Sequence, residues 1–223
     1  MSAADPHARA QVLLLAAHQL ELEPLAATLG ATLDRELAGR RVTAVAVGVG
    51  MTLAGAGAMR ALLQWRPEQA ILLGSYGIYP GRGELVPGRL LVPTELCALD
   101  ASVLAGHAAF PEPMPTSVVT DAGLQTALCA LCSDALSGAL GTTLAITTDD
   151  ALAAELGQRS GCAGENLEAL AVGLACKSAG VPFAAVLGCT NEVGARGRRQ
   201  WREHHALAAQ TSTACVVRWL LGG

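Results

Sequence analysis

The chain has 223 residues, of which 52% are hydrophobic, 15% charged and 3% aromatic. This composition excludes a disordered protein, because so much apolar side-chain area must be buried in a core. The length fits one compact α/β domain better than two small ones. The mean hydropathy of +0.40 raises the question of a membrane protein. No apolar run reaches the roughly 18 residues that a membrane-spanning helix needs, so membrane insertion is not expected.

The formal net charge is −4, from 15 basic and 19 acidic residues with histidine neutral. The main basic cluster, at 196–202, is typical of a solvated approach to a helix. A mildly acidic chain with one short basic cluster lacks the electrostatic footprint of a nucleic-acid-binding protein. We therefore expect neither nucleic acid nor a membrane as a partner.

The chain contains seven cysteines, an odd number, and no charged-then-apolar leader at its start. These features predict free thiols in a reducing, cytoplasmic environment. Cys129 and Cys132 have the C-x2-C spacing of metal and redox sites, but they lack a second pair at suitable spacing. On a helix the two would share an apolar face, which favours small core residues over metal ligands. Neither a metal nor a cofactor is expected.

Short apolar segments alternate with segments of helical periodicity along the chain, after a segment at 1–9 that is expected to be disordered. Segments rich in proline and glycine are expected to be loops. In chain order we expect strand 11–17, helix 20–29, strand 41–47, helix 51–65, strand 69–74, loop 79–83, strand 89–93, loop 110–115, helix 120–132, strand 141–147, helix 149–156, helix 166–179, strand 183–188 and helix 199–221.

This alternation predicts crossover connections between neighbouring parallel strands. Residues 10–223 are therefore expected to form a single-domain, three-layer α/β/α fold with a mixed, mostly parallel central sheet. Short strands covered on both faces explain why the hydrophobic residues are spread over many segments. Ligands of such folds bind beyond the carboxyl ends of the strands, so polar residues after each strand are the candidates for a site.

Several of these positions carry residues of interest. Gly48 and Gly50 follow a predicted strand, but the third glycine of the dinucleotide fingerprint is missing at its spacing. They indicate either a plain tight turn from strand to helix or a turn that brings backbone close to a ligand at a helix start. Glu21, Glu168 and Asn191 follow other predicted elements, and each of them taken alone is typical of a cap or surface residue.

Four motifs give these positions a common meaning. They are Ala-x3-Glu at 17–21, Ile-Leu-Leu-Gly-Ser-Tyr-Gly at 71–77 with Val-Pro-Gly at 86–88, Glu-Asn-Leu-Glu-Ala at 165–169, and Asn-Glu-Val-Gly-Ala-Arg at 191–196 with Trp201 beyond. Together they resemble the purine nucleoside phosphorylase and nucleosidase superfamily, and within it the futalosine hydrolases most closely. The resemblance covers 12–221, and the motif at 191–196 is its most specific part. Leu167 stands where the family usually has methionine, and Thr147-Thr148-Asp149 replaces the family's threonine-glycine pair.

The resemblance implies hydrolysis of a purine N-glycosidic bond. Glu21 would act as general base on water, Glu168 would accept hydrogen bonds from the ribose hydroxyls, and Asn191 would contact the base during catalysis. The other expected substrate-binding residues are Gly50, Ser75, Tyr76, Gly77, Thr148, Asn166 and Leu167. The family's adenine-specific nucleosidases have aspartic acid at the last position, whereas an amide suits a 6-oxopurine such as hypoxanthine. The expected substrate is therefore futalosine or a similar 6-oxopurine nucleoside, cleaved in menaquinone biosynthesis.

Alternatives remain within and outside this function. Phosphorylases of the hexameric kind carry an arginine at the position of Leu72 and a Gly-x-x-x-Arg loop at 18–22, and their absence favours water as nucleophile. A methylthioadenosine/adenosylhomocysteine nucleosidase, another purine nucleosidase or phosphorylase, and a non-catalytic nucleoside-binding homologue are the other readings. The resemblance also implies a homodimer or higher homo-oligomer.

The sequence leaves two features of the site open. A ring that stacks on the base must come from Tyr76, Phe183 or Trp201, because the chain has few aromatic residues. Arg196 and Arg198 are candidates to meet a substrate carboxylate, although both lie in the basic cluster.

Overall fold

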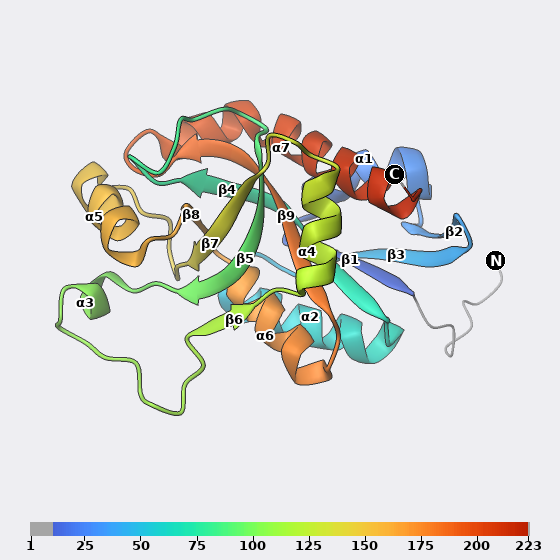
Figure 1. Ribbon diagram of the computed structural model, residues 1–223, viewed down its shortest axis with the longest axis horizontal. Coiled ribbons are helices and arrows are strands. Elements are labelled where there is room, and N and C mark those ends of the chain that lie inside the picture. Colours follow the sequence, from blue (N-terminus) through green and yellow to red (C-terminus); the bar gives the residue numbers. More distant parts are fainter. Residues whose placement is uncertain (1–10, 223) are drawn as a thin grey trace.

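Figure 1 shows the computed structural model, which describes residues 11–222. The segment 1–9 lies outside the described residues, as do the two end residues of the predicted domain. The elements are β1 (Val12–Ala16), α1 (Gln19–Leu29), β2 (Asp34–Leu37), β3 (Arg40–Ala46), α2 (Met51–Trp65), β4 (Gln69–Ile78), β5 (Leu90–Ala98), α3 (Ala101–Leu104), β6 (Ser117–Val119), α4 (Ala122–Ala130), β7 (Leu136–Thr142), α5 (Asp150–Ser160), β8 (Gly164–Asn166), α6 (Ala169–Ala179), β9 (Phe183–Glu192) and α7 (Gly197–Leu220).

Within residues 11–222, nine strands form one mixed sheet with the order β2-β3-β1-β4-β8-β7-β5-β6, and β9 pairs with both β4 and β5. The pairs β1–β3, β1–β4, β4–β9, β5–β7 and β7–β8 are parallel. The pairs β2–β3, β4–β8, β5–β6 and β5–β9 are antiparallel. These pairings join β4, β8, β7, β5 and β9 into a ring, so this half of the sheet curls back on itself like a small barrel. The sequence did not predict this closure.

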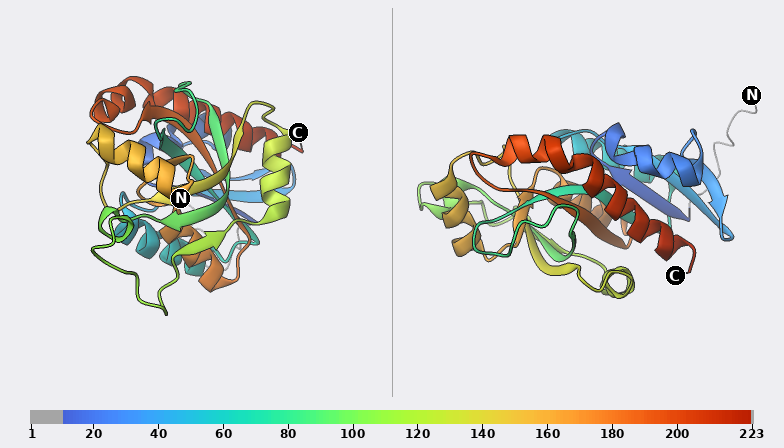
Figure 2. Two further views of the ribbon diagram at one scale, coloured as in Figure 1. Left: turned by 60° about the vertical axis from the view of Figure 1, so that its left-hand side comes forward. Right: turned by 90° about the horizontal axis from the view of Figure 1, so that it is seen from above.

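Helices cover the sheet on two sides, which confirms the three-layer prediction (Figure 2). Helices α2 and α6 pack on one side, where Ala54, Ala58 and Leu170 join side chains from β1 and β4 in one buried cluster. Helices α1, α4 and α7 cover the other side, where Leu25 and Val216 join a second cluster. The strands are apolar on both faces because both faces are covered.

Two glycines set how closely helices approach the sheet. A Cβ on Gly57 of α2 would lie 2.0 Å from the carbonyl oxygen of Val47, directly after β3. A Cβ on Gly188 of β9 would lie 2.6 Å from Cα of Ala208 in α7. Neither position has room for a side chain, so these contacts draw α2 and α7 against the strand ends that carry the site.

Several expected elements are shifted in the structure. The strand expected at 141–147 is β7 at Leu136–Thr142, and 143–149 is a loop. The strand expected at 89–93 continues to Ala98, because the missing N–H of Pro93 falls at a break in the β5–β7 register, where it is tolerated. The helix expected from 166 begins at Ala169, since Gly164–Asn166 form β8. Strands β4 and β9 also run four residues further than expected.

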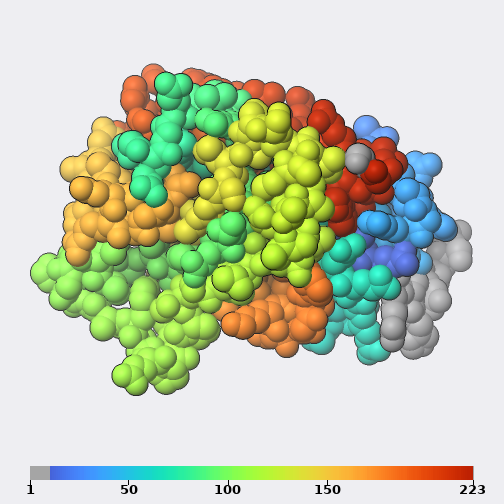
Figure 3. All heavy atoms as spheres, viewed as in Figure 1, coloured from blue at the N-terminus to red at the C-terminus, as the bar shows by residue number. Residues whose placement is uncertain are grey.

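The elements that the sequence analysis missed are the shortest ones. Strands β2, β6 and β8 and helix α3 are three or four residues long, too short for a periodic pattern to identify. The loop expected at 110–115 is part of an exposed segment between α3 and β6, which protrudes at the lower left of Figure 3. Among residues 11–222, no helix is long and apolar enough to cross a membrane.

Candidate active site

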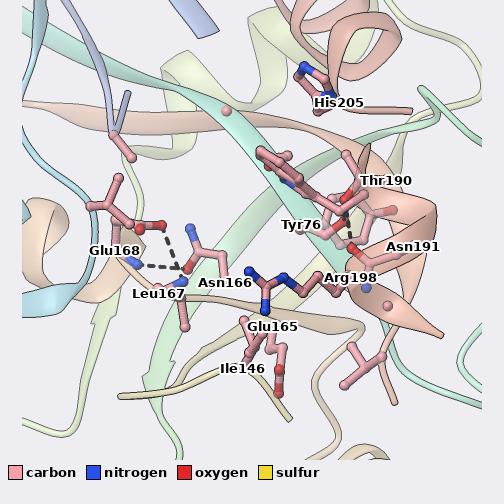
Figure 4. A pocket seen from close by; sticks show the side chains of 18 of the residues that line it. Tyr76, Ile146, Glu165, Asn166, Leu167, Glu168, Thr190, Asn191, Arg198 and His205 are labelled. Carbon is pink, nitrogen blue, oxygen red and sulfur yellow. Dashed lines mark hydrogen bonds between the residues drawn. The ribbon is translucent and has the colours of Figure 1, made fainter. Parts of the chain in front are cut away.

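A cavity of about 630 Å³ opens beyond the carboxyl ends of β1, β4 and β9. The turn from β8 into α6 and the first turns of α7 complete its wall (Figure 4). This is the edge of the sheet at which α/β folds bind ligands. Nine of the residues expected in the site line this cavity: Glu21, Ser75, Tyr76, Gly77, Thr148, Asn166, Leu167, Glu168 and Asn191.

Glu21 is held at the start of α1 by a capping box. The imidazole Nδ1 of His18 accepts the backbone N–H of Leu20 at 3.2 Å, and the Glu21 carboxylate accepts the N–H of His18 at 3.1 Å. Burial raises the pKa of Glu21 to about 7, and the negative charge of Glu168 adds to the rise. Hydrogen bonds from the His18 backbone and the Ser75 hydroxyl act in the opposite direction. The site thus contains a carboxyl group that titrates near neutral pH.

Glu168 lies at the start of α6, and its carboxylate joins two segments. Oε1 accepts the N–H of Gly50 at 2.9 Å, and Oε2 accepts the N–H of Leu167 at 3.2 Å. Burial raises the pKa of this carboxyl group too. Gly50 does not line the cavity. It instead holds Glu168 through its backbone, with a φ of 84° that favours glycine.

Asn166 is fixed by its side-chain oxygen. Oδ1 accepts the Thr142 hydroxyl at 3.3 Å and the N–H of Ala169 at 3.2 Å. These bonds orient the amide so that its NH₂ group is available to a ligand in the cavity, which Asn166 lines. The end of β7 therefore positions a cavity residue of β8.

Asn191 lies near the end of β9, where its amide is also oriented. The Thr190 hydroxyl donates to Oδ1 at 2.7 Å, and Nδ2 donates to the carbonyl of Glu192 at 3.1 Å. One lone pair and one N–H of the amide remain for a ligand. A Cβ on Gly77 would lie 2.7 Å from Nδ2 of Asn191, so the glycine leaves space for this side chain.

The geometry can be compared with known proteins. A family model described as the phosphorylase superfamily matches residues 4–220. The chain belongs to this superfamily. The resemblance inferred from the four sequence motifs is thereby confirmed at the level of the superfamily. No curated protein matches the chain.

Solved structures of superfamily members share the fold of this phosphorylase-superfamily chain. A methylthioadenosine/adenosylhomocysteine nucleosidase from Neisseria meningitidis, in complex with methylthio-immucillin-A, has a TM-score of 0.84 at 19% identity and covers 95% of this chain and 99% of its own. The enzyme of this name from Helicobacter pylori has a TM-score of 0.83 at 15% identity, with 96% and 98% covered. One from Colwellia psychrerythraea, in complex with adenine, has 0.82 at 19% identity, with 96% and 95% covered. At identities this low, the structural likeness shows a common fold and nothing more specific.

The three aromatic residues expected as stacking candidates differ in how they lie relative to the cavity. Phe183 lies in the core and does not line the cavity. Tyr76 borders the cavity but is only 2% exposed, with its ring in the core. Trp201 is 41% exposed and stacks on His205 with ring centroids 4.8 Å apart, and both line the cavity. His205 was not predicted, although its i, i+4 spacing from Trp201 on a helix was a usable signal.

The structure distinguishes between the two arginines that were candidates to meet a substrate carboxylate. Arg198 lines the cavity, and its side chain extends into it in Figure 4. Arg196 lies outside the cavity wall and pairs with Glu192 at 3.3 Å. Of the two, Arg198 is the one that a bound ligand can reach.

Glu165 is a cavity residue that sequence reasoning missed. It is 6% exposed, and its carboxylate accepts the Tyr79 hydroxyl at 2.7 Å, the Thr147 N–H at 2.9 Å and the Thr147 hydroxyl at 2.8 Å. Its charge is therefore satisfied by three donors. This anchor holds the loop 143–149, whose residues Ile146 and Thr148 line the cavity.

Replacing Glu165 with alanine is expected to lower the free energy of unfolding by about 3 kcal/mol, because the buried donors of Tyr79 and Thr147 lose their acceptor. Urea denaturation at pH 7 measures this loss. Glu155→Ala is a matched control, since Glu155 is half exposed on α5 and pairs only with Arg159 in its own helix among the described residues. Equal stability of the two variants would contradict the anchoring role.

Proposed function

We propose that the chain is a hydrolase that cleaves the N-glycosidic bond of futalosine or a similar 6-oxopurine nucleoside and releases hypoxanthine. The observation that carries the proposal is the meeting of Glu21, Glu168 and Asn191 at one cavity. Such a cleavage needs a base to activate water, a stabiliser of the positively charged ribosyl centre, and a hydrogen-bonding partner for the departing purine. The three side chains supply these groups.

The environment of Glu21 supports its role as general base. A carboxyl group with a pKa of about 7 holds a proton far better than an ordinary glutamate and is still partly ionised at neutral pH. Glu168 brings a second carboxylate to the same cavity, where it can accept the ribose hydroxyls and offset positive charge at the anomeric carbon. We assign water activation to Glu21 and ribose binding to Glu168.

The pH dependence follows from the raised pKa of Glu21. A general base must be ionised, so kcat/KM is expected to rise with pH through an apparent pKa of about 7 and to level off above it. A profile of kcat/KM between pH 5 and 9 measures this. A profile that instead falls as the pH rises through 7 would assign the essential form to the protonated carboxyl group and contradict the base role.

The amide of Asn191 supports a 6-oxopurine. Its remaining N–H can donate to one acceptor of hypoxanthine and its remaining lone pair can accept the N–H group of that base, whereas protonation of adenine would call for an acid at this position. Water as nucleophile is supported by Leu72, which is buried in the core at the position where the resemblance expects the arginine of phosphorylases.

A methylthioadenosine/adenosylhomocysteine nucleosidase is the second candidate. The solved structures of this kind share the fold over 95% or more of the chain, which favours it. Purified protein incubated separately with futalosine and methylthioadenosine distinguishes the candidates by chromatography of the released base. Faster release of hypoxanthine supports the first proposal, and faster release of adenine supports the second. Absence of release from both, with tight binding retained, would identify a non-catalytic nucleoside-binding protein.

Location and assembly are further parts of the proposal. The seven cysteines are free thiols in the structure, which supports a reducing, cytoplasmic compartment. Exposed apolar side chains at the cavity mouth, including Val49 and Ile146, support a homodimer or higher homo-oligomer that covers them. Release of hypoxanthine from futalosine would place the enzyme in menaquinone biosynthesis.

A further inference from the structure

Arg198 brings a positive charge into the cavity. It lies in the first turn of α7, and among residues 11–222 it has no carboxylate within ion-pair distance. Its neighbours in the sequence differ, because Arg196, the N-cap of α7, pairs with Glu192 at 3.3 Å and Arg199 approaches Glu203 at 3.9 Å. The guanidinium of Arg198 is therefore available to a ligand.

The position of Arg198 is on the side of the cavity assigned to the base. A Cβ on Gly197, the residue before it, would lie 3.0 Å from Nδ2 of Asn191, so the start of α7 abuts Asn191. In the view of Figure 4, the guanidinium lies between Asn166 and Asn191, and Glu168 is on the far side of Asn166. A purine in contact with Asn191 would thus present an edge to Arg198.

The chemistry of that edge differs between purines. A 6-oxopurine carries two acceptors, O6 and N7, and a guanidinium can donate two parallel hydrogen bonds to them. Adenine replaces O6 with an amino group, which is a donor and meets the N–H groups of arginine unfavourably. Negative charge that develops on a departing 6-oxopurine spreads to the same two atoms, where a cation stabilises it.

We propose that Arg198 reads the O6/N7 edge of the base and selects 6-oxopurine over 6-aminopurine nucleosides. This rests on the proposed function and gives the base site a second group beside Asn191. Asn191 supplies a neutral hydrogen-bonding group, and Arg198 supplies the charge that favours hypoxanthine as a leaving group.

The test compares 5′-methylthioinosine with 5′-methylthioadenosine, which differ only at position 6 of the base. Arg198→Met is expected to reduce the ratio of kcat/KM for the inosine compound to that for the adenosine compound by about 10- to 100-fold. The loss falls on the inosine compound, and Arg198→Lys recovers part of it. Arg199→Met is the matched control, because Arg199 lies on the same helix turn but does not line the cavity.

An unchanged ratio in Arg198→Met would overturn the proposal. So would a loss confined to futalosine, since that would assign Arg198 to the substrate carboxylate instead of the base. Calorimetric binding of free hypoxanthine and adenine separates this proposal from the proposed function. If the parent protein cleaves neither nucleoside but prefers hypoxanthine, and Arg198→Met removes that preference, the base-reading role stands without the hydrolase. If Arg198→Met binds the two bases as the parent does, the role is excluded whatever the activity.

Discussion

Replacement of Glu21 with glutamine is expected to lower kcat/KM for the nucleoside substrate by about 10²- to 10⁴-fold, because general base catalysis contributes factors of this size. Glutamine keeps the shape of the side chain and an oxygen that can accept the His18 N–H, but it cannot take a proton from water. Steady-state release of free base measures the loss. The pH dependence near 7 is expected to disappear together with the activity.

The stability of Glu21→Gln distinguishes lost chemistry from lost folding. The pKa of Glu21 is about 7 in the folded chain against an ordinary value of 4.5, so the folded state binds the proton more tightly. Its contribution to stability is present below pH 4.5 and is lost as the pH rises through 7. Glu21→Gln is therefore expected to be more stable than the parent above pH 7, by about 1–2 kcal/mol once partial exposure is allowed for. Glu23→Gln, on the exposed side of α1, is the control for both measurements. Full activity in Glu21→Gln would contradict the base assignment.

Replacement of Glu168 with glutamine is expected to lower kcat/KM by about 10²- to 10³-fold. The substitution removes the negative charge that we propose faces the ribosyl centre, and losses of this size follow when a group that stabilises transition-state charge is deleted. A large part of the loss should appear in kcat, since the charge matters most when the anomeric carbon becomes positive. Steady-state kinetics on one substrate separates kcat from KM.

The kinetic loss in Glu168→Gln reports on chemistry only if the variant keeps the structural contacts of Glu168. Glutamine can still accept the N–H of Gly50, which Oε1 accepts at 2.9 Å, so the start of α6 is expected to remain joined to α2. An unchanged circular dichroism spectrum and melting temperature would confirm this. Wild-type kcat with only a raised KM would restrict Glu168 to ground-state binding of the ribose and contradict its role in the transition state.

The architecture was predictable where patterns are long. Helix α2 occurs at the predicted 51–65, because its small and apolar residues have helical spacing and Pro67 follows it. Strand β7 was misplaced because Gly138 and Gly141 interrupt its pattern, while the apolar residues after it belong to an exposed loop. The closure of the sheet through β8 and β9 depends on pairing between distant strands, which periodicity does not contain.

The candidate site was predictable where a residue belongs to a motif. Glu21, Glu168 and Asn191 were found in this way, and all three line the cavity. Glu165 belongs to the motif at 165–169 but was not predicted as a site residue, since its three donors come from segments far away in the sequence. The short supply of aromatic residues left Tyr76, Phe183 and Trp201 as candidates for a stacking ring, and the structure shows that Trp201 is the exposed one, stacked on His205 at the cavity wall.

The central claim is hydrolysis of a 6-oxopurine nucleoside, and the most direct test follows the oxygen that reaches the anomeric carbon. Purified protein is incubated with futalosine in ¹⁸O-labelled water, with and without phosphate, and the products are analysed by mass spectrometry. We predict release of hypoxanthine at a rate independent of phosphate, with one ¹⁸O atom in the freed sugar. Formation of a sugar 1-phosphate, with no base released when phosphate is omitted, would contradict the account.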